Sequence, residues 1–455
     1  MLVQHVFHPL GSIDEVVRRE PGRCHTRRAN ARSDSPLMGL VHQLTLRLGG
    51  RGMAVDRGLM GRTATKTGAI YLARHTMSSR VRRFVPRRTV GDLRAGATAD
   101  GWNADEGPAP EQPGVDATQA APLAALTGRD PSPFVRGCAW TAGAGVAYPR
   151  ADPSDCSRLP LDTWSAAQLP VGVRVEFVGD AEAVTIAYRT ETDDLGYRGS
   201  GAGRSFALWR RGTLVDEQPA ALGEAAVQLR TGSNGPDERA IVYLPEGMRP
   251  TLLSIEPVGG RIETPPPQPR WIAYGDSIAE GWIASAPARS WPAMAGRAHG
   301  LDVCNLGYAG SARGEIVSAE HIASIPAAVI SISHGTNCWT RIPHSVAMLR
   351  DGTQAFLEIV RQGHPETPIV VVSPVIRPDA EATPNRVGAT LAALRAGIED
   401  TVQGRREAGD ANLELVPGQP LLTAEHLPDG IHPGDEGHAI LAARIGAVVA
   451  SIAHF

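Results

Sequence analysis

Apolar residues recur at every second position in short runs between residues 134 and 260. Val171, Val173 and Val175 alternate with polar or small residues, and similar runs follow, separated by Gly, Pro, Asn and Asp. This period is typical of antiparallel strands with one buried face, and a series of about seven or more such runs predicts a β-sandwich or jelly roll. We expect this domain to occupy residues 132–262.

The proline-rich stretch at residues 263–270 predicts a stiff, extended linker, and a different pattern begins after it. Beyond it, short apolar runs alternate with longer segments of helical periodicity. Strands are predicted at residues 271–274, 302–305, 328–333, 369–373 and 413–416, and helices at residues 290–299, 345–361, 383–404 and 436–453. Such alternation predicts an α/β domain over residues 271–455, with a doubly wound parallel sheet covered by helices on both faces.

The first 131 residues lack sustained apolar periodicity and are rich in Arg, Gly, Pro and Ala. A segment of this composition cannot bury enough apolar surface to offset its loss of chain entropy. We therefore expect residues 1–131 to form a mostly disordered extension. Basic clusters such as the one at residues 80–83 leave contact with nucleic acid or a membrane open as an alternative role for this extension.

Composition narrows the class of protein. The 455 residues carry a formal net charge of −3, and 42% of them are hydrophobic, which suffices for packed cores. The predicted folded part has no strongly basic face and no apolar run long enough to span a bilayer, so we expect neither a nucleic-acid nor a membrane partner. The amino terminus lacks the pattern of a secretion signal, which favours a cytoplasmic location.

The five cysteines are scattered and include no Cys-x-x-Cys pair, so neither a zinc site nor a disulfide framework is expected.

Polar blocks follow the predicted strands of the second domain. Ser277 comes after the first strand, Gly310 after the second and Asn337 after the third, while Asp429 and His432 precede the last helix. Because the carboxyl ends of parallel strands meet at one edge of a sheet, we expect these blocks to converge there. A serine needs a base and an oxyanion site to attack an acyl carbon, and a carboxylate three residues before a histidine can orient its ring.

The order and spacing of these four blocks resemble the SGNH, or GDSL, hydrolase family across essentially all of residues 271–455. The resemblance implies a flavodoxin-like doubly wound sheet. It also implies that Ser277 is the nucleophile, His432 the general base and Asp429 the residue that orients the imidazole. The oxyanion hole would consist of the backbone N–H groups of Ser277 and Gly310 and the side-chain amide of Asn337.

Other residues near the same edge allow two interpretations. Trp282 and Trp339 are candidates to stack an aromatic acyl group or a sugar, and Arg313 and Arg377 are candidates to hold a carboxylate. All four could equally pack against the sandwich. His334 is a candidate both for lining the pocket and for a structural role, whereas His426 and His438 are expected at the surface. Cys338 stands where many members of the family have aspartate, which affects loop geometry and substrate class more than the triad.

Together these patterns predict a serine esterase or acyltransferase that works through an acyl-enzyme and requires no metal or organic cofactor. The two-domain arrangement is similar to two branches of the family, carbohydrate acetylesterases with an amino-terminal jelly roll and natural-product acyltransferases. Deacetylation of glycans is therefore one alternative, and a non-catalytic glycan-binding protein is another. The expected partner is a small-molecule or carbohydrate ester, with an alcohol acceptor in the case of transfer. The sequence does not specify the oligomeric state.

Overall fold

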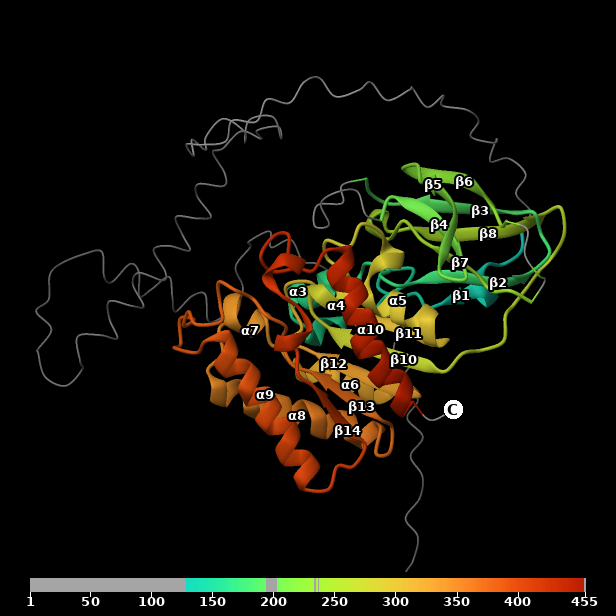
Figure 1. Cartoon of the computed structure of the whole chain (residues 1–455). Coiled ribbons are helices and arrows are strands. Elements are labelled where there is room, and N and C mark those ends of the chain that lie inside the picture. The colour runs from blue at the N-terminus through green and yellow to red at the C-terminus, as the bar shows by residue number, and fades with distance from the viewer. Residues whose placement is uncertain (1–127, 194–202, 233–234, 236, 454–455) are drawn as a thin grey trace, which may run out of the picture. The chain divides into compact units, whose positions relative to one another are not determined.

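The computed structural model describes residues 128–193, 203–232, 235 and 237–453. The extension predicted over residues 1–131 lies, apart from its last four residues, outside the described residues. The described residues form antiparallel sheets in the first half and a parallel sheet flanked by helices in the second half (Figure 1).

The parallel sheet has five strands in the order β11-β10-β12-β13-β14. They are β10 (Arg270–Gly275), β11 (Asp302–Gly307), β12 (Val329–Ser333), β13 (Ile369–Val372) and β14 (Leu413–Val416). Every neighbouring pair is parallel, which confirms the predicted α/β fold. The three central strands are short runs buried on both faces, while the edge strands β11 and β14 include polar or half-buried residues. The first strand, β10, lies between β11 and β12, so the chain order reverses beside it, where ligands bind in open sheets.

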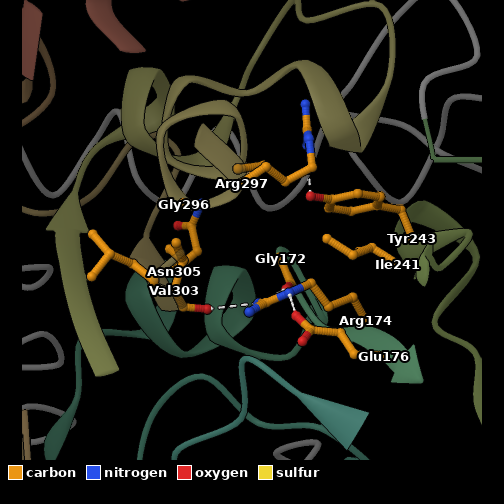
Figure 2. A pocket seen from close by; sticks show the side chains of 11 residues that line it. Gly172, Arg174, Glu176, Ile241, Tyr243, Gly296, Arg297, Val303 and Asn305 are labelled. Atoms are coloured by element: carbon orange, nitrogen blue, oxygen red, sulfur yellow. Dashed lines mark hydrogen bonds and ion pairs between the residues drawn. The ribbon is translucent and has the colours of Figure 1, made fainter. Parts of the chain in front are cut away.

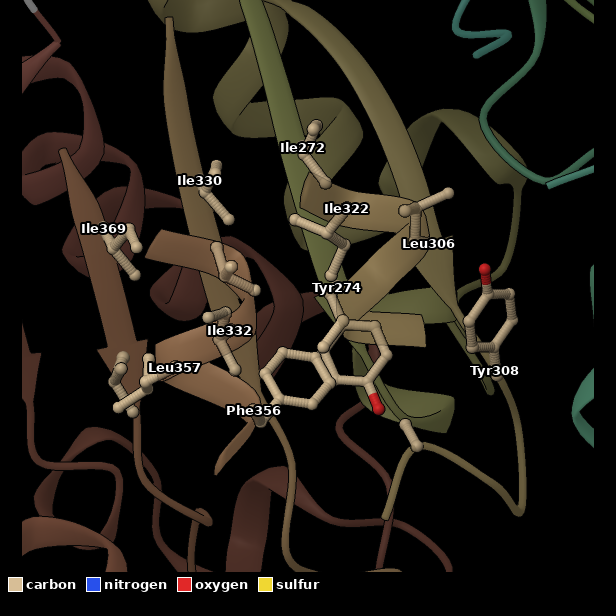
Figure 3. Packing of buried hydrophobic residues seen from close by; sticks show 14 of the residues in the cluster. Ile272, Tyr274, Leu306, Tyr308, Ile322, Ile330, Ile332, Phe356, Leu357 and Ile369 are labelled. Atoms are coloured by element: carbon tan, nitrogen blue, oxygen red, sulfur yellow. The ribbon is translucent and has the colours of Figure 1, made fainter. Parts of the chain in front are cut away.

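Helices cover both faces of this sheet. One face carries α5 (Trp291–His299) and α10 (Asp435–Ile452), and the other carries α6 (Ile316–Ser324), α8 (Val346–Gly363) and α9 (Leu391–Glu407). Alternate residues of β10 supply the two cores, since Trp271 packs with the first group of helices and Tyr274 with the second. The ring of Tyr274 lies 4.9 Å from that of Phe356 on α8, measured between centroids (Figure 3).

Two of the helices that cover the sheet differ from the sequence prediction. The helix expected at residues 383–404 begins only at Leu391, because the side chain of Thr390 accepts the backbone N–H of Ala393 and caps the helix there. The short helix α6 was not predicted at all. Only four of its nine residues are buried, so its periodicity is weak in the sequence.

Two antiparallel sheets precede the parallel one. The first has the order β1-β2-β7-β4-β5, with β9 also paired to β2, and the second has the order β6-β3-β8. Their strands are β1 (Val135–Arg136), β2 (Arg174–Gly179), β3 (Ala183–Thr190), β4 (Ser205–Arg210), β5 (Thr213–Pro219), β6 (Gly223–Arg230), β7 (Ala240–Tyr243), β8 (Thr251–Val258) and β9 (Ile262–Glu263). We refer to residues 170–263 as the antiparallel region. Its two sheets share one apolar core, which includes Phe177, Ile186, Leu208 and Val242. Its assignment as a separate jelly-roll domain over residues 132–262 stays a prediction.

Residues 150–169, which contain α3 (Leu161–Ala167), precede the antiparallel region in the chain but pack elsewhere. Leu159 and Trp164 belong to the same apolar cluster as Tyr308 and the parallel sheet. This α3 segment therefore lies against the carboxyl edge of the parallel sheet. The sequence prediction grouped it with the sandwich, because its position along the chain is the only local cue to its packing.

Buried arginines join the antiparallel region to the edge strand β11. Arg174 donates hydrogen bonds to the backbone oxygen of Val303 at 3.0 Å and to Oδ1 of Asp302 at 2.8 Å, and it pairs with Glu176 at 2.6 Å (Figure 2). The cavity beside these residues has a volume of about 20 Å³, room for a single water molecule. This junction is consequently a packed interface and not a ligand site.

In the described part of the chain, no helix combines the length and the apolar character that crossing a bilayer requires.

Candidate active site

The loops after the parallel strands surround one cavity of about 750 Å³. Ser277, Gly310, Asn337 and His432, the residues singled out in the sequence, all line it. Asp429 stands behind His432. The structure thus brings together residues that lie up to 155 positions apart in the chain.

Ser277 is the first residue of the short helix α4 (Ser277–Glu280), directly after β10. The turn is sharp because Gly275 has no side chain: a Cβ there would lie 2.6 Å from Cβ of Ala279. Asp276 caps α4 by accepting the backbone N–H of Ile278 at 2.9 Å, and burial raises the pKa of this carboxyl above its ordinary value. Strand, turn and cap therefore hold Ser277 rigidly at the sheet edge.

A chain of hydrogen bonds connects serine, histidine and aspartate. The Oγ of Ser277 lies 2.9 Å from Nε2 of His432, and Nδ1 of His432 lies 2.7 Å from Oδ2 of Asp429. Because an ionised carboxylate only accepts hydrogen bonds, Nδ1 carries the proton, and Nε2 is then free to accept the serine hydroxyl. The arrangement can deprotonate a serine during attack on a carbonyl carbon.

Asp429 is itself held by the backbone. Its Oδ1 accepts the N–H groups of Ile431 at 2.9 Å and His432 at 2.7 Å. Partial burial alone would raise the pKa of Asp429, but the hydrogen bonds from the His432 side chain and from the two backbone N–H groups outweigh it, so the pKa lies below its ordinary value. The carboxylate stays ionised and fixes the orientation of the imidazole.

The indole of Trp282 lies next to the imidazole of His432. The two rings have centroids 5.7 Å apart at an interplanar angle of 36°, and both residues line the cavity. The indole restricts the rotation of the histidine ring and gives this end of the cavity an aromatic wall.

The three residues expected to form an oxyanion hole, Ser277, Gly310 and Asn337, all line the cavity. The amide of Asn337 donates one hydrogen bond to the backbone oxygen of Ser311 at 2.6 Å, which orients the side chain and leaves its second N–H for a ligand. The backbone N–H groups of Ser277 and Gly310 have no acceptor among the described residues. Gly310 has a φ of +73°, a conformation that glycine adopts without strain.

A buried ion pair supports the loop that contains Gly310. Glu280 accepts the backbone N–H of Ala309 at 2.7 Å, and its carboxylate lies 3.6 Å from the guanidinium of Arg150. Arg150 also donates to the backbone oxygens of Ala166 and Leu169, both at 2.6 Å, and to that of Gly307. This ion pair was not predicted, since nothing in the local sequence links Arg150 to a loop so distant in the chain.

The walls of the cavity come from three parts of the chain. Thr192, Gly247 and Arg249 of the antiparallel region line it, and so do Leu169 and three other residues of the α3 segment. The sequence prediction left open whether the first domain binds sugar or forms a wall of the active site. In the structure it forms part of the wall, which only the fold could reveal.

The secondary candidates separate into two groups. Trp282 and Arg377 line the cavity. Arg313 does not, because both its terminal nitrogens bind Asp162, at 2.9 and 3.1 Å. Trp339 donates its indole N–H to a backbone oxygen at 2.8 Å, and its ring lies 4.9 Å from the guanidinium of Arg377.

The other histidines near the site have structural positions. His334 packs against Tyr274 and Phe356 outside the cavity lining, and burial lowers its pKa to about 4. The prediction that His438 lies at the surface was wrong: it is fully buried, and its Nδ1 accepts the backbone N–H of Trp291 at 3.3 Å. The buried position follows from its place on the inner face of α10. His426 is half-buried.

Cys338 follows Asn337 but faces away from the cavity. Its thiol is fully buried and lies 3.8 Å from the backbone oxygen of Arg313. Burial raises the pKa of this thiol, which opposes formation of a reactive thiolate. Among the residues that the structure describes, no cluster of His, Cys, Asp and Glu has the geometry of a metal site.

Fold and site together define an α/β enzyme of the hydrolase or acyltransferase class. Residues 268–450 match a family model described as the GDSL-like Lipase/Acylhydrolase family. A comparison with curated protein sequences gave no significant match.

Solved structures are similar over a larger share of the chain. The salicylyl-acyltransferase SsfX3 from a tetracycline biosynthetic pathway is similar at 25% identity and a TM-score of 0.61, over 70% of this chain and 96% of that chain. A GDSL-like lipase from Bacteroides ovatus ATCC 8483 shares the fold at 22% identity and a TM-score of 0.58, over 70% of this chain and 95% of that chain.

Proposed function

We propose that the chain is a serine esterase or acyltransferase that forms an acyl-enzyme on Ser277. The observation that carries this proposal is the hydrogen-bond chain from Ser277 through His432 to Asp429, with distances of 2.9 and 2.7 Å, at the wall of a large cavity. The GDSL-like domain and the likeness to an acyltransferase support the same class of reaction.

In the first half-reaction the hydroxyl oxygen of Ser277 attacks the ester carbonyl carbon while Nε2 of His432 takes the hydroxyl proton. The carbonyl π electrons move to the oxygen, where the N–H groups of Ser277 and Gly310 and the amide of Asn337 stabilise the negative charge. Collapse of this intermediate breaks the bond to the leaving group, which receives the proton from His432. Asp429 keeps the imidazolium oriented throughout.

In the second half-reaction water or an alcohol attacks the acyl-enzyme, and His432 again takes the proton. The 25% identity to a salicylyl-acyltransferase over 96% of its length supports transfer to an alcohol acceptor. An aromatic acyl group would pack against Trp282, which lines the cavity beside His432. A screen of aryl, acetyl and carbohydrate esters with and without alcohol acceptors, read by product mass, distinguishes transfer from hydrolysis and from glycan deacetylation.

The test of the proposal is labelling with a fluorophosphonate together with cleavage of p-nitrophenyl acetate. Wild-type protein should label on Ser277 and turn over the ester, and Ser277→Ala should do neither. The matched control is Ser451→Ala, because Ser451 is an exposed serine on α10, and this variant should behave as wild type. Ester cleavage that persists in Ser277→Ala would show that another residue is the nucleophile. A folded wild-type protein that neither labels nor cleaves would favour the glycan-binding alternative.

A further inference from the structure

The positive charges in the lining of the large cavity are not all paired with its negative charges. Besides the catalytic histidine, the charged residues that line it in the described part of the chain are Asp162, Glu280, Arg249, Arg341 and Arg377. Their individual partners determine which of these charges remain available to a ligand.

Both acidic residues are neutralised from outside the cavity. Asp162 receives two hydrogen bonds from Arg313, at 2.9 and 3.1 Å. Burial alone would raise the pKa of Asp162, but the bonds from Arg313 outweigh it and the pKa lies below its ordinary value, so the carboxylate is charged and paired. Glu280 lies 3.6 Å from the buried guanidinium of Arg150. Neither Arg313 nor Arg150 lines the cavity.

One arginine of the cavity is also paired. Arg377 forms a two-point contact with Asp379, at 2.9 and 3.0 Å. Arg249 and Arg341, by contrast, form no ion pair with any described residue. Within the described part of the chain, the cavity therefore presents two positive charges without an acidic partner. In the sequence, Arg313 and Arg377 were candidates either to hold a carboxylate or to pack against the sandwich, and both of those guanidinium groups are occupied by aspartates.

Arg341 lies beside the residues that would hold the oxyanion. A Cβ placed on Gly310 would lie 3.0 Å from both Nε and Cζ of Arg341, so the guanidinium rests against the backbone of Gly310. Arg341 is an exposed residue and lines the cavity. A substrate whose carbonyl binds at Gly310 therefore has a cation within reach of its neighbouring atoms.

Arg249 reaches the cavity from the antiparallel region. It is half-buried and has a φ of 51°, a left-handed conformation that costs an arginine about 1 kcal/mol or more. This conformation directs the chain between Gly247 and Pro250 around the cavity rim. Glu191 shares a smaller neighbouring cavity with Arg249 but forms no ion pair with it. Strain of this kind is retained where the surrounding structure needs the residue in place.

The cavity lining also includes apolar residues, which can accommodate the uncharged part of a ligand. Ala166 and Leu169 of the α3 segment and Trp282 and Ile431 of the α/β domain contribute to it. The same cavity therefore offers apolar contacts and two cationic side chains to a ligand bound at Ser277.

We propose that Arg341 and Arg249 bind an anionic group, a carboxylate or a phosphate, in the acyl or alcohol part of the ester. This inference rests on the proposed function and specifies its substrate class. Planar guanidinium groups bind both anions through two parallel hydrogen bonds, and a cavity of one sign of charge also concentrates anions from solution.

The first test compares matched anionic and neutral esters with the full-length protein. For the acyl side the pair is p-nitrophenyl hydrogen glutarate and p-nitrophenyl valerate, and for the alcohol side p-acetoxyphenyl phosphate and p-methoxyphenyl acetate. We expect kcat/KM to favour the anionic member of at least one pair by about tenfold to a hundredfold, the value of hydrogen bonds to a charged group. The pair that shows the preference identifies the part of the ester that carries the anion.

Variants then assign the preference to the arginines. Arg341→Gln and Arg249→Gln should each lower the ratio of the two kcat/KM values about tenfold, and Arg341→Lys should retain part of it because the charge remains. Arg386→Gln is the matched control, since Arg386 is an exposed arginine outside the cavity, and it should leave the ratio unchanged. A wild-type ratio near one for both pairs, or an unchanged ratio in both glutamine variants, overturns the proposal.

A binding measurement separates this inference from the proposed chemistry. Ser277→Ala keeps both arginines, so titration calorimetry of this variant with glutarate and with inorganic phosphate reports on anion binding without turnover. Binding that weakens about tenfold or more in Ser277→Ala/Arg341→Gln supports the inference even if no ester is cleaved. Failure of both anions to bind, without any preference among the esters, overturns it. Anion binding in a wild-type protein that does not label with fluorophosphonate would instead overturn the proposed function alone.

Discussion

The buried ion pair between Arg150 and Glu280 provides the sharpest test of how this site is held together. The side chain of Arg150 is 1% exposed and that of Glu280 is 0% exposed, and the charged groups are 3.6 Å apart. Arg150→Met would leave the Glu280 carboxylate buried without its cation. Removing one partner of a buried pair typically costs about 3–5 kcal/mol, because the other charge is then uncompensated in a medium of low polarity.

The hydrogen bonds of Arg150 to backbone oxygens add to this cost. The guanidinium donates to Ala166 and Leu169 of the α3 segment, both at 2.6 Å, and to Gly307 at the end of β11. Since a folded domain is stable by only about 5–15 kcal/mol, we expect Arg150→Met to remove a third or more of the free energy of unfolding. The loop from Gly307 to Gly310 should also lose order, which lowers kcat for p-nitrophenyl acetate.

A double-mutant cycle distinguishes this explanation from general damage to the core. Glu280→Gln in the Arg150→Met background removes the uncompensated charge, while the amide oxygen can still accept the N–H of Ala309. We expect the double variant to be more stable than the sum of the single variants by about 1–3 kcal/mol, measured by urea unfolding followed by tryptophan fluorescence. A cost below about 1 kcal/mol for Arg150→Met, or strictly additive single effects, would refute the reasoning. Arg386→Gln, which changes an exposed arginine, should stay within about 0.5 kcal/mol of wild type.

Three further predictions concern single side chains. Asn337→Ala removes an oxyanion donor and should lower kcat by roughly a hundredfold to a thousandfold with little change in KM, which steady-state kinetics would reveal; an unchanged kcat contradicts its role. Asp429→Asn should keep the fold but lower kcat by roughly ten-thousandfold, because the amide no longer enforces the correct tautomer of His432. Burial lowers the pKa of His334 to about 4 in the folded protein, whereas in the unfolded chain it is about 6.5. Below pH 6.5 the unfolded state therefore gains a proton that the folded state does not bind, and wild type should lose about 2–3 kcal/mol of stability as the pH falls from 7 to 4.5. Urea unfolding at both pH values should show a smaller loss in His334→Gln, and an equal loss would contradict the assignment.

The parallel sheet and the positions of the reactive groups could be predicted from local patterns. Each strand of the sheet is a short apolar run, and Ser277, Gly310, Asn337 and His432 follow such runs or precede the last helix. Parallel strands place their carboxyl ends at one edge whatever the details of packing. The convergence of these residues therefore required only the element order to be right.

Side-chain partners could not be predicted in the same way. Arg313 and Arg341 both follow Gly310 in the chain, yet Arg313 is bound by Asp162 while Arg341 faces the cavity. Sequence reasoning chose Arg313 as a candidate for anion binding and did not consider Arg341. An arginine carries no local sign of whether a carboxylate from a distant segment will neutralise it.

The sequence by itself determined the alternation of strands and helices and the types of residue at the sheet edge, because periodicity and turn residues act over a few positions. Only the tertiary structure decided that the α3 segment packs on the parallel sheet, that Arg249 completes the cavity wall and that Arg150 meets Glu280. These contacts join positions that are far apart in the chain, and their free energy depends on burial and charge in the folded state. No local pattern encodes such quantities, so they emerge only when the whole fold brings the partners together.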